Sequence, residues 1–279
     1  MKILYPLAKR FIAGHDFDSA KPKIEKLIEE GYEVSVDYLG EVSQTVAQCE
    51  RAKRQYIEII NYYKNNKINI SIKPSQLGIL IDPLFCRENL LFLAELAKLR
   101  GHTIRLDMED ARITDATINL AIYLNDKFQN VGVALQANLH RTNKDIHHLI
   151  KHGVSVRLVK GAYKENPDIA FQSDYAIEGW FFDYAARLYS EKANKPAIAT
   201  HDEELIEDVH ELITDSKYYD YELLYGIRRD LQKDLKDKGY KVRIYVPFGK
   251  DWMPYCTRRL KEFKNLKFVI RNVIKEWFK

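Results

Sequence analysis

The chain has 279 residues, 46% of them hydrophobic and 30% charged, with a formal net charge of +4. This composition excludes a disordered chain, and the lack of a dense Lys/Arg block with interleaved aromatic residues argues against a nucleic-acid-binding groove. No apolar run reaches the roughly 20 residues that span a bilayer, and the first residues predict no signal peptide. The three cysteines are widely spaced, which predicts neither a disulfide framework nor a zinc site and fits a reducing cytoplasm.

Apolar and polar residues alternate repeatedly along the chain, and this period of two predicts short strands. In residues 68–73, for example, Ile68, Ile70 and Ile72 alternate with polar side chains. The expected strands are 32–38, 68–73, 102–107, 131–136, the first half of 154–163, 197–201, 221–225 and 241–247. Helical patterns are expected at 20–30, 43–65, 87–100, 115–128, 144–152, 171–193, 203–214, 228–238 and after Trp252, followed by an apolar and basic segment at 266–278.

Eight strands that alternate with helices over about 250 residues predict an α/β fold, a single (β/α)8 barrel of the TIM type. A doubly wound open sheet is the alternative, but its strands would be apolar on both faces. Here one face of the strands is aliphatic and the other is small or polar, which favours the barrel. Because no linker or composition shift divides the chain, we expect one domain over 1–279. It would comprise a short N-terminal arm and helix at 1–30, the barrel at 31–264 and an extra C-terminal helical segment at 265–279.

The segment 154–163 shows how polar residues are placed on these strands. Arg157 points opposite to the apolar residues of its strand, and Gly161 ends that strand. An arginine on the inner face is costly to bury without a partner. For this strand taken alone, a structural ion pair and a functional site are equally good interpretations.

Other strands repeat this design, and their inner polar residues fall near the carboxyl ends, where barrel enzymes place their active sites. The strand-end residues are Asp37, Lys73, Asp107, Gln136, Arg157, Lys160, Thr200, His201 and Tyr245. Their mixture of carboxylates and cations suits an anionic ligand held beside a larger cofactor. Arg258 and Arg259 follow in the last helix. Paired arginines can bind a carboxylate bidentately, although the local sequence by itself favours an exposed basic helix face.

Eight motifs, taken in chain order, resemble those of the proline dehydrogenase family. They are Asp37-Tyr-Leu-Gly-Glu41, Lys73-Pro-Ser-Gln-Leu-Gly78, Arg105-Leu-Asp-Met-Glu-Asp110, Leu135-Gln-Ala137, Arg157-Leu-Val-Lys-Gly-Ala-Tyr163, Ala199-Thr-His-Asp202, Leu224-Tyr-Gly-Ile-Arg228, and Tyr245-Val-Pro-Phe-Gly249 continuing to Arg258-Arg259. The match extends from about Lys9 to Arg271 and resembles the stand-alone bacterial enzymes in length. The chain has no G-x-G-x-x-G fingerprint, which argues against a Rossmann flavin site.

The resemblance implies an FAD-dependent barrel that oxidises L-proline to 1-pyrroline-5-carboxylate, the first step of proline catabolism, and passes the electrons to a quinone. It also implies that Asp107 and Arg157 are catalytic, with Arg157 near the flavin N5. The implied substrate-binding residues are Lys73, Arg258 and Arg259, which hold the carboxylate, and Tyr245, which packs against the proline ring. The implied flavin-binding residues are Met108, Gln136, Arg157, Lys160, Gly161, Ala162, Thr200 and His201, with Tyr163 and Glu262 as wall residues.

Two other functions stay open at this point: a Schiff-base lyase that uses Lys73 or Lys160, and a barrel that binds flavin or proline without turnover. The C-terminal segment either docks on the barrel, which is the favoured interpretation for a short terminal helix, or contacts the inner face of the membrane, where quinone resides. No metal is expected, because the pair His147 and His148 has no acidic partner at ligand spacing.

Overall fold

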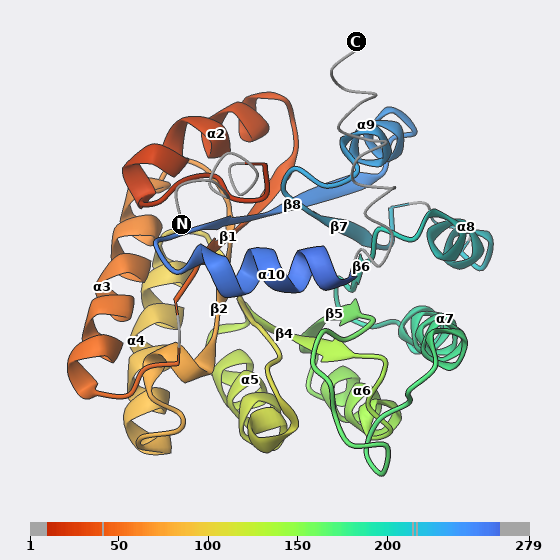
Figure 1. The fold of residues 1–279 in the computed structure, drawn as a ribbon, viewed down its shortest axis with the longest axis horizontal. Coiled ribbons are helices and arrows are strands. Elements are labelled where there is room, and N and C mark those ends of the chain that lie inside the picture. Colours follow the sequence, from red (N-terminus) through yellow and green to blue (C-terminus); the bar gives the residue numbers. More distant parts are fainter. Residues whose placement is uncertain (1–9, 41, 214, 216, 263–279) are drawn as a thin grey trace.

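The strands form a closed parallel barrel in which consecutive strands pair and β1 pairs with β8 (Figure 1). The computed structural model describes residues 10–40, 42–213, 215 and 217–262. The strands are β1 Glu33–Tyr38, β2 Asn69–Ile72, β3 Thr103–Leu106, β4 Val131–Gln136, β5 Ser155–Val159, β6 Ala197–Ala199, β7 Asp220–Leu224 and β8 Lys241–Phe248. The predicted (β/α)8 fold is confirmed.

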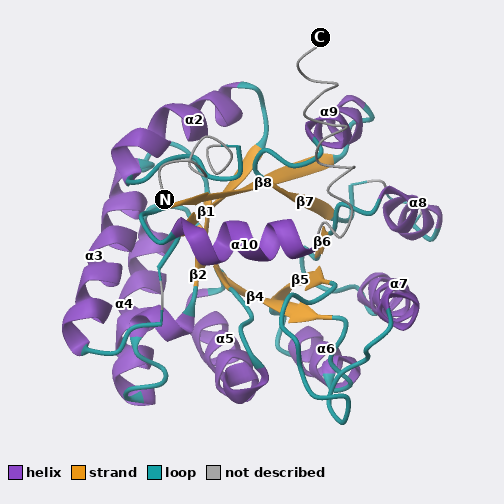
Figure 2. Cartoon of the chain, viewed as in Figure 1, coloured by secondary structure: helices purple, strands orange, loops and turns teal. Residues whose placement is uncertain are grey.

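Helices surround the barrel and cover its outer face (Figure 2). They are α2 Phe17–Glu29, α3 Val46–Tyr62, α4 Pro83–Leu99, α5 Thr114–Phe128, α6 Thr142–Lys151, α7 Asp174–Ser190, α8 Glu203–Glu211 and α9 Arg229–Asp237. A last helix, α10 Trp252–Glu262, and two short 3-10 turns, η1 Pro74–Leu77 and η2 Ala111–Ile113, lie outside this ring. The start of α4 precedes the expected residue 87. Asp82 accepts a hydrogen bond from the Leu84 N–H and Pro83 fits the first turn, so the cap decides the helix start.

The hydrophobic core lies between the outer face of the strands and the helices. Val36, Ile70 and Leu158 are fully buried there. Because side chains alternate along a strand, the residues between them point into the barrel, and many of these are polar and buried: Ser35, Asp37, Asn69, Ser71, Arg105, Arg157 and Glu222. Barrels of this type usually fill their interior with branched aliphatic side chains. A polar interior must be internally paired to be stable.

Helix α10 lies across the carboxyl ends of the strands (Figure 1). Trp252, Tyr255 and Cys256 pack against Leu39, which follows β1, and Ile227, which follows β7. These contacts form a small apolar cluster separate from the main core. The helix therefore covers part of the barrel mouth, on the side where the strand-end polar residues gather.

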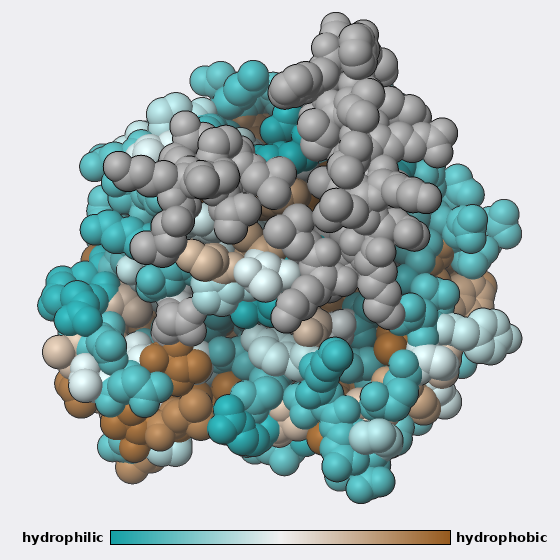
Figure 3. Space-filling model, viewed as in Figure 1, coloured by the Kyte–Doolittle hydropathy of each residue, from teal (hydrophilic) through white to brown (hydrophobic). Residues whose placement is uncertain are grey.

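Most of the surface described in Figure 3 is hydrophilic, with a hydrophobic patch at the lower left in the region of α3 and α4. Leu80, Ile81 and Leu84 are exposed at the start of α4. Among the described residues, no helix has the length and apolar character needed to cross a membrane. The segment 265–279 lies outside the described residues, so its docking or membrane contact stays a prediction.

Candidate functional site

Side chains from five strands meet at the carboxyl end of the barrel, as their strand-end positions predict. The ammonium group of Lys73 donates to Asp37 Oδ1 at 2.5 Å and to Asp107 Oδ2 at 3.1 Å. The Tyr245 hydroxyl donates to the same Asp107 oxygen at 2.7 Å. The guanidinium of Arg157 binds the other oxygen of Asp107. Asp107 therefore joins the two cations of the cluster.

The guanidinium of Arg157 is held from several directions. Its Nη2 binds Asp107, and its Nη1 donates to Glu222 Oε1 at 2.7 Å and to Ser71 Oγ at 3.2 Å. The centroid of the Tyr245 ring lies 5.2 Å from the central carbon of the guanidinium. The Nε–H has no acceptor among the residues that the structure describes. Arg157 thus forms ion pairs with Asp107 and Glu222, and its Nε–H is a buried donor without an acceptor among the described residues.

Glu222 is a further member of this cluster that the motifs and strand ends do not predict. Its side chain is 2% exposed and lies across the barrel from β2 and β3, in contact with Arg157. The signal was available, because Glu222 stands between the apolar Tyr221 and Leu223 and alternation places it on the inner face of β7. An acidic residue in that position is a natural partner for an inward arginine.

Charge pairing sets the protonation states in the cluster. Burial opposes the ionisation of Asp107, but the charges of Lys73 and Arg157 outweigh it and lower its pKa to about 2. Burial also disfavours the charged form of Lys73, yet Asp37 and Asp107 together raise its pKa. For Asp37 burial is the larger effect, and its pKa is raised despite the adjacent Lys73. Asp107 and Lys73 are therefore both charged at neutral pH.

A second charged layer fills the barrel toward the amino ends of the strands. Asp220 on β7 pairs with Arg243 on β8 at 2.8 Å, and Arg105 on β3 donates to the Ser155 carbonyl at 2.8 Å. Burial lowers the pKa of Arg105 to about 9. Carboxylates and cations therefore alternate within the barrel, and Arg243 also contacts Glu33 at the start of β1. The inward charged residues include Asp37, Asp107, Asp220 and Glu222 with Lys73, Arg105, Arg157 and Arg243.

The expected flavin-binding residues lie on or just after the carboxyl ends of β3 to β6. Lys160 pairs with Asp202 at 2.6 Å and with Glu178 at 2.8 Å. Gly161 has a φ of +116°, and a Cβ there would lie 2.2 Å from Asn138 Oδ1, so the backbone at this position requires glycine. Among the remaining expected flavin-binding residues, Met108, Gln136 and Thr200 are buried, whereas Ala162 is exposed.

His201 follows β6 and is neutral. Burial, with smaller effects from Arg259 and Arg228, lowers its pKa to about 3. Its Nε2 accepts a hydrogen bond from the Leu224 N–H at 3.2 Å, so in the neutral ring the proton belongs on Nδ1. That Nδ1 is buried, and no residue in the described part of the chain accepts from it. His201 thus presents a second buried donor.

The two arginines of α10 face different parts of the mouth. The guanidinium of Arg259 lies 5.3 Å from the centroid of the Tyr255 ring, and its charge acts on His201. The charge of Arg258 acts on Tyr163, whose pKa is raised mainly by burial. Both arginines are partly buried, so the expected exposed basic face is not what α10 presents here. The Glu262 side chain lies outside what the structure describes.

Two further features bear on the site. No group of three acidic, histidine or cysteine side chains among the described residues could hold a metal ion.

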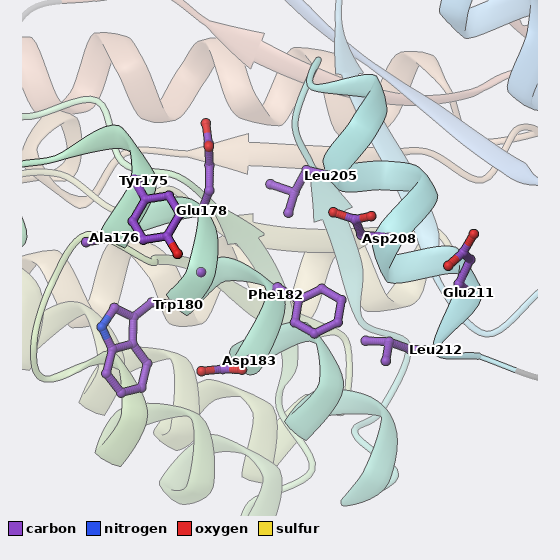
Figure 4. Close-up of a pocket in the computed structure, with 11 residues that line it drawn as sticks. Tyr175, Ala176, Glu178, Trp180, Phe182, Asp183, Leu205, Asp208, Glu211 and Leu212 are labelled. Carbon is purple, nitrogen blue, oxygen red and sulfur yellow. The ribbon is translucent and has the colours of Figure 1, made fainter.

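A groove of about 720 Å³ lies between α7 and α8, on the outside of the barrel (Figure 4). Its lining combines apolar side chains such as Leu205 and Phe182 with acidic ones such as Asp208. Glu178 also lines it and binds Lys160, which connects the groove to the rim of the barrel.

Comparison with known proteins gives consistent matches. The family model described as proline dehydrogenase matches residues 20–271. The chain is 32% identical over 278 residues to Proline dehydrogenase 2 of Bacillus subtilis (strain 168), covering 96% of this chain and 91% of that protein. It is 32% identical over 286 residues to Proline dehydrogenase of Deinococcus radiodurans, covering 98% of this chain and 91% of that protein. The solved structure of proline utilization A (PutA) from Bdellovibrio bacteriovorus, inactivated by N-propargylglycine, has the same fold, with a TM-score of 0.89 at 23% identity over 97% of this chain and 34% of that one.

Proposed function

This chain belongs to the proline dehydrogenase family, and we propose that it oxidises L-proline to 1-pyrroline-5-carboxylate, the first step of proline catabolism. We propose FAD as its bound cofactor and a quinone as the final electron acceptor. The observation that carries the proposal is the charged cluster at the barrel mouth, where Asp107 joins Lys73 to Arg157. Such a cluster can hold a small charged substrate in a fixed orientation beside a cofactor.

Two buried donors support an FAD site at this rim. Arg157 Nε–H and His201 Nδ1–H have no acceptor in the described part of the chain, and buried donors in native proteins usually have one. The isoalloxazine ring carries nitrogen and carbonyl oxygen acceptors of the kind that these donors need. FAD supplies, when bound, the two-electron acceptor that protein side chains lack. The residues that we propose to hold it are Met108, Gln136, Arg157, Lys160, Gly161, Ala162, Thr200 and His201.

The substrate carboxylate is the group that the cations of the mouth would bind. We propose Arg258 and Arg259 as its main partners, because both belong to α10, the helix that lies across the mouth, and a guanidinium can bind a carboxylate bidentately. Lys73 already donates to Asp37 and Asp107, and at 3.4 Å to Tyr245 Oη. All three of its N–H groups therefore have acceptors. Lys73 can donate to a substrate carboxylate only if it gives up one of these three hydrogen bonds. The bond to the Tyr245 hydroxyl is the longest of the three.

The oxidation removes a hydride from the ring carbon next to the proline nitrogen and a proton from that nitrogen, which passes to solvent, so that a C=N bond forms. The two electrons leave with the hydride and pass in a second half-reaction to the quinone. A fixed positive charge stabilises negative charge that develops during electron arrival, and Arg157 is the residue that we propose for this role. Asp107 is ionised and hydrogen-bonded to Arg157, Lys73 and Tyr245, so it keeps all three in place.

The Schiff-base lyase is less compatible with the geometry. An amine nucleophile must be neutral when it attacks a carbonyl. Lys73 and Lys160 each lie between two carboxylates, which overcome the effect of burial and raise the pKa of both ammonium groups. Both lysines are therefore protonated ion-pair partners and not free amines.

An absorption spectrum tests the proposed function. The purified protein should show the visible absorption band of an oxidised flavin, and anaerobic addition of L-proline should bleach it. D-proline, with its carboxylate on the opposite face of the ring, serves as the control and should leave the band nearly unchanged. A protein that purifies with flavin but is not bleached by L-proline would contradict the proposed oxidation, while acid-released flavin without an adenylate would contradict FAD.

A further inference from the structure

Glu222 is a buried carboxylate that neither the motifs nor the proposed substrate and cofactor contacts use. It lies on β7, whereas Arg157 lies on β5, so the two side chains meet across β6. In register, Arg157 pairs with Ala197, and Ala197 pairs with Asp220. Because neighbours in register face the same side, Ala197 and, two residues on, Ala199 also point inward. Their short side chains leave the space that the ion pair crosses.

The contacts of Arg157 divide into two sets. The pair with Asp107 connects it to the cluster that we propose to face the substrate, and the contacts with Glu222 and Ser71 both involve the other terminal nitrogen. A guanidinium is planar and rigid, so one contact at a terminal nitrogen still allows it to rotate, whereas a contact at each terminal nitrogen fixes its plane and with it the direction of the Nε–H. The Glu222 carboxylate is charge-complementary, 2% exposed and 2.7 Å away, which makes it the stronger of the two anchors on that side.

We propose that Glu222 is a positioning residue for the oxidation: it anchors Nη1 of Arg157 and, together with Asp107 on Nη2, fixes the plane of the guanidinium and the direction of its Nε–H. This inference rests on the proposed function of Arg157. Glu222 does not act on the substrate directly. Its absence would let the guanidinium rotate about its contact with Asp107, and a misplaced charge near the reacting atoms lowers the rate more than it lowers substrate affinity.

Two conservative substitutions separate position from charge. Glu222→Gln removes the charge but keeps a carbonyl oxygen at the same reach, so Nη1 can still donate to it. Glu222→Asp keeps the charge but shortens the side chain by one methylene, so the anchor moves away from Arg157. A positioning role predicts that Gln preserves function better than Asp. A role in charge balance alone predicts the reverse order.

The matched control is Asp220→Asn, on the same strand. Asp220 is also an inward carboxylate, and it pairs with Arg243 at 2.8 Å and not with Arg157. This substitution therefore reports what the loss of a barrel carboxylate does to the fold in general. It is expected to change the rate of flavin reduction by less than about threefold.

The measurement is stopped-flow flavin reduction by L-proline on the purified holoenzymes. For Glu222→Asp we expect the limiting rate to fall by about tenfold or more, with the apparent Kd for proline changed by less than about threefold. For Glu222→Gln we expect a rate within about threefold of wild type. The dissociation constant of FAD is measured from the flavin fluorescence released on dilution. It should rise in Glu222→Asp and stay unchanged in Glu222→Gln, because the Arg157 Nε–H is displaced only in Glu222→Asp.

Each other outcome overturns the inference. Wild-type behaviour of both variants would show that Arg157 needs no anchor at Glu222, and an impaired Gln variant beside an active Asp variant would show that charge matters and position does not. Equal losses in Glu222→Asp and Asp220→Asn would show a structural effect common to barrel carboxylates. Failure of the proposed function is distinguishable, because the wild-type holoenzyme itself would then not be reduced by proline.

Discussion

The substitution Asp107→Asn tests whether the charged cluster stabilises the barrel as its geometry indicates. The ordinary pKa of an Asp carboxyl is 3.8, and in the folded protein that of Asp107 is lowered to about 2. The difference corresponds to about 2 kcal/mol of folding free energy at neutral pH. Breaking a buried ion pair completely costs about 3–5 kcal/mol. We expect the lower figure, because Lys73 keeps Asp37 and Arg157 keeps Glu222 as partners.

The pH dependence provides an independent check on the same residue. Because folding lowers the pKa of Asp107, its contribution to stability is complete above the unfolded value of 3.8 and is lost as the pH falls through about 2. The difference in unfolding free energy between wild type and Asp107→Asn should therefore be constant from pH 7 to pH 5. It should fall to roughly half near pH 3, because there the carboxyl of the unfolded chain is mostly protonated while that of the folded protein is still mostly ionised.

Urea unfolding followed by circular dichroism measures these free energies, with FAD at one saturating concentration because a ligand bound to the folded state adds to stability. Asp110→Asn is the matched control. Asp110 lies near Asp107 in sequence but is 33% exposed and pairs with Arg112, which is 74% exposed, so the expected loss is below about 1 kcal/mol. A loss in Asp107→Asn no larger than in this control would refute the reasoning.

Three further substitutions test individual roles. Arg258→Met should raise the KM for proline far more than it lowers the flavin content of the purified protein; equal loss of both would contradict a carboxylate clamp. Arg157→Ala should weaken FAD binding and slow flavin reduction, and unchanged reduction kinetics in stopped-flow would count against its catalytic role. Gly161→Ala should lower flavin content and cost about 1–2 kcal/mol of stability in the same urea assay, because φ is +116° and the added Cβ would meet Asn138 Oδ1 at 2.2 Å. A fully flavinylated, equally stable variant would show that the loop relaxes without harm.

The barrel mouth could be predicted in outline because parallel strands bring their carboxyl ends to one rim. Asp37, Lys73, Asp107, Arg157 and Tyr245 were each placed there from alternation alone, and the structure confirms that they meet. Their proposed roles in binding proline or FAD stay predictions, because they come from the family resemblance and not from a measured contact.

Other features could not be read from a one-dimensional pattern. The sequence pattern does not identify the ion-pair partner of Arg157, because an ion pair inside a barrel joins strands that are distant in sequence. Only the closed sheet brings the Glu222 carboxylate to the Arg157 guanidinium. Likewise, each N–H of the Lys73 ammonium group has an acceptor only because the fold brings three side chains from different strands to it: Asp37, Asp107 and Tyr245. The helix start at Pro83 depends on a local cap that the apolar periodicity does not report.

The amino-acid sequence by itself determined the eight β/α units and which residues face inward, because both follow from periodicities of two and 3.6 residues along one chain. Only the tertiary structure decided which inward charges pair, which buried donors find no acceptor among the described residues, and where α10 lies with its two arginines. The physical reason is that ion pairing depends on distance through space, and closure of the barrel brings residues from β2, β3, β5 and β7 within a few ångströms of one another.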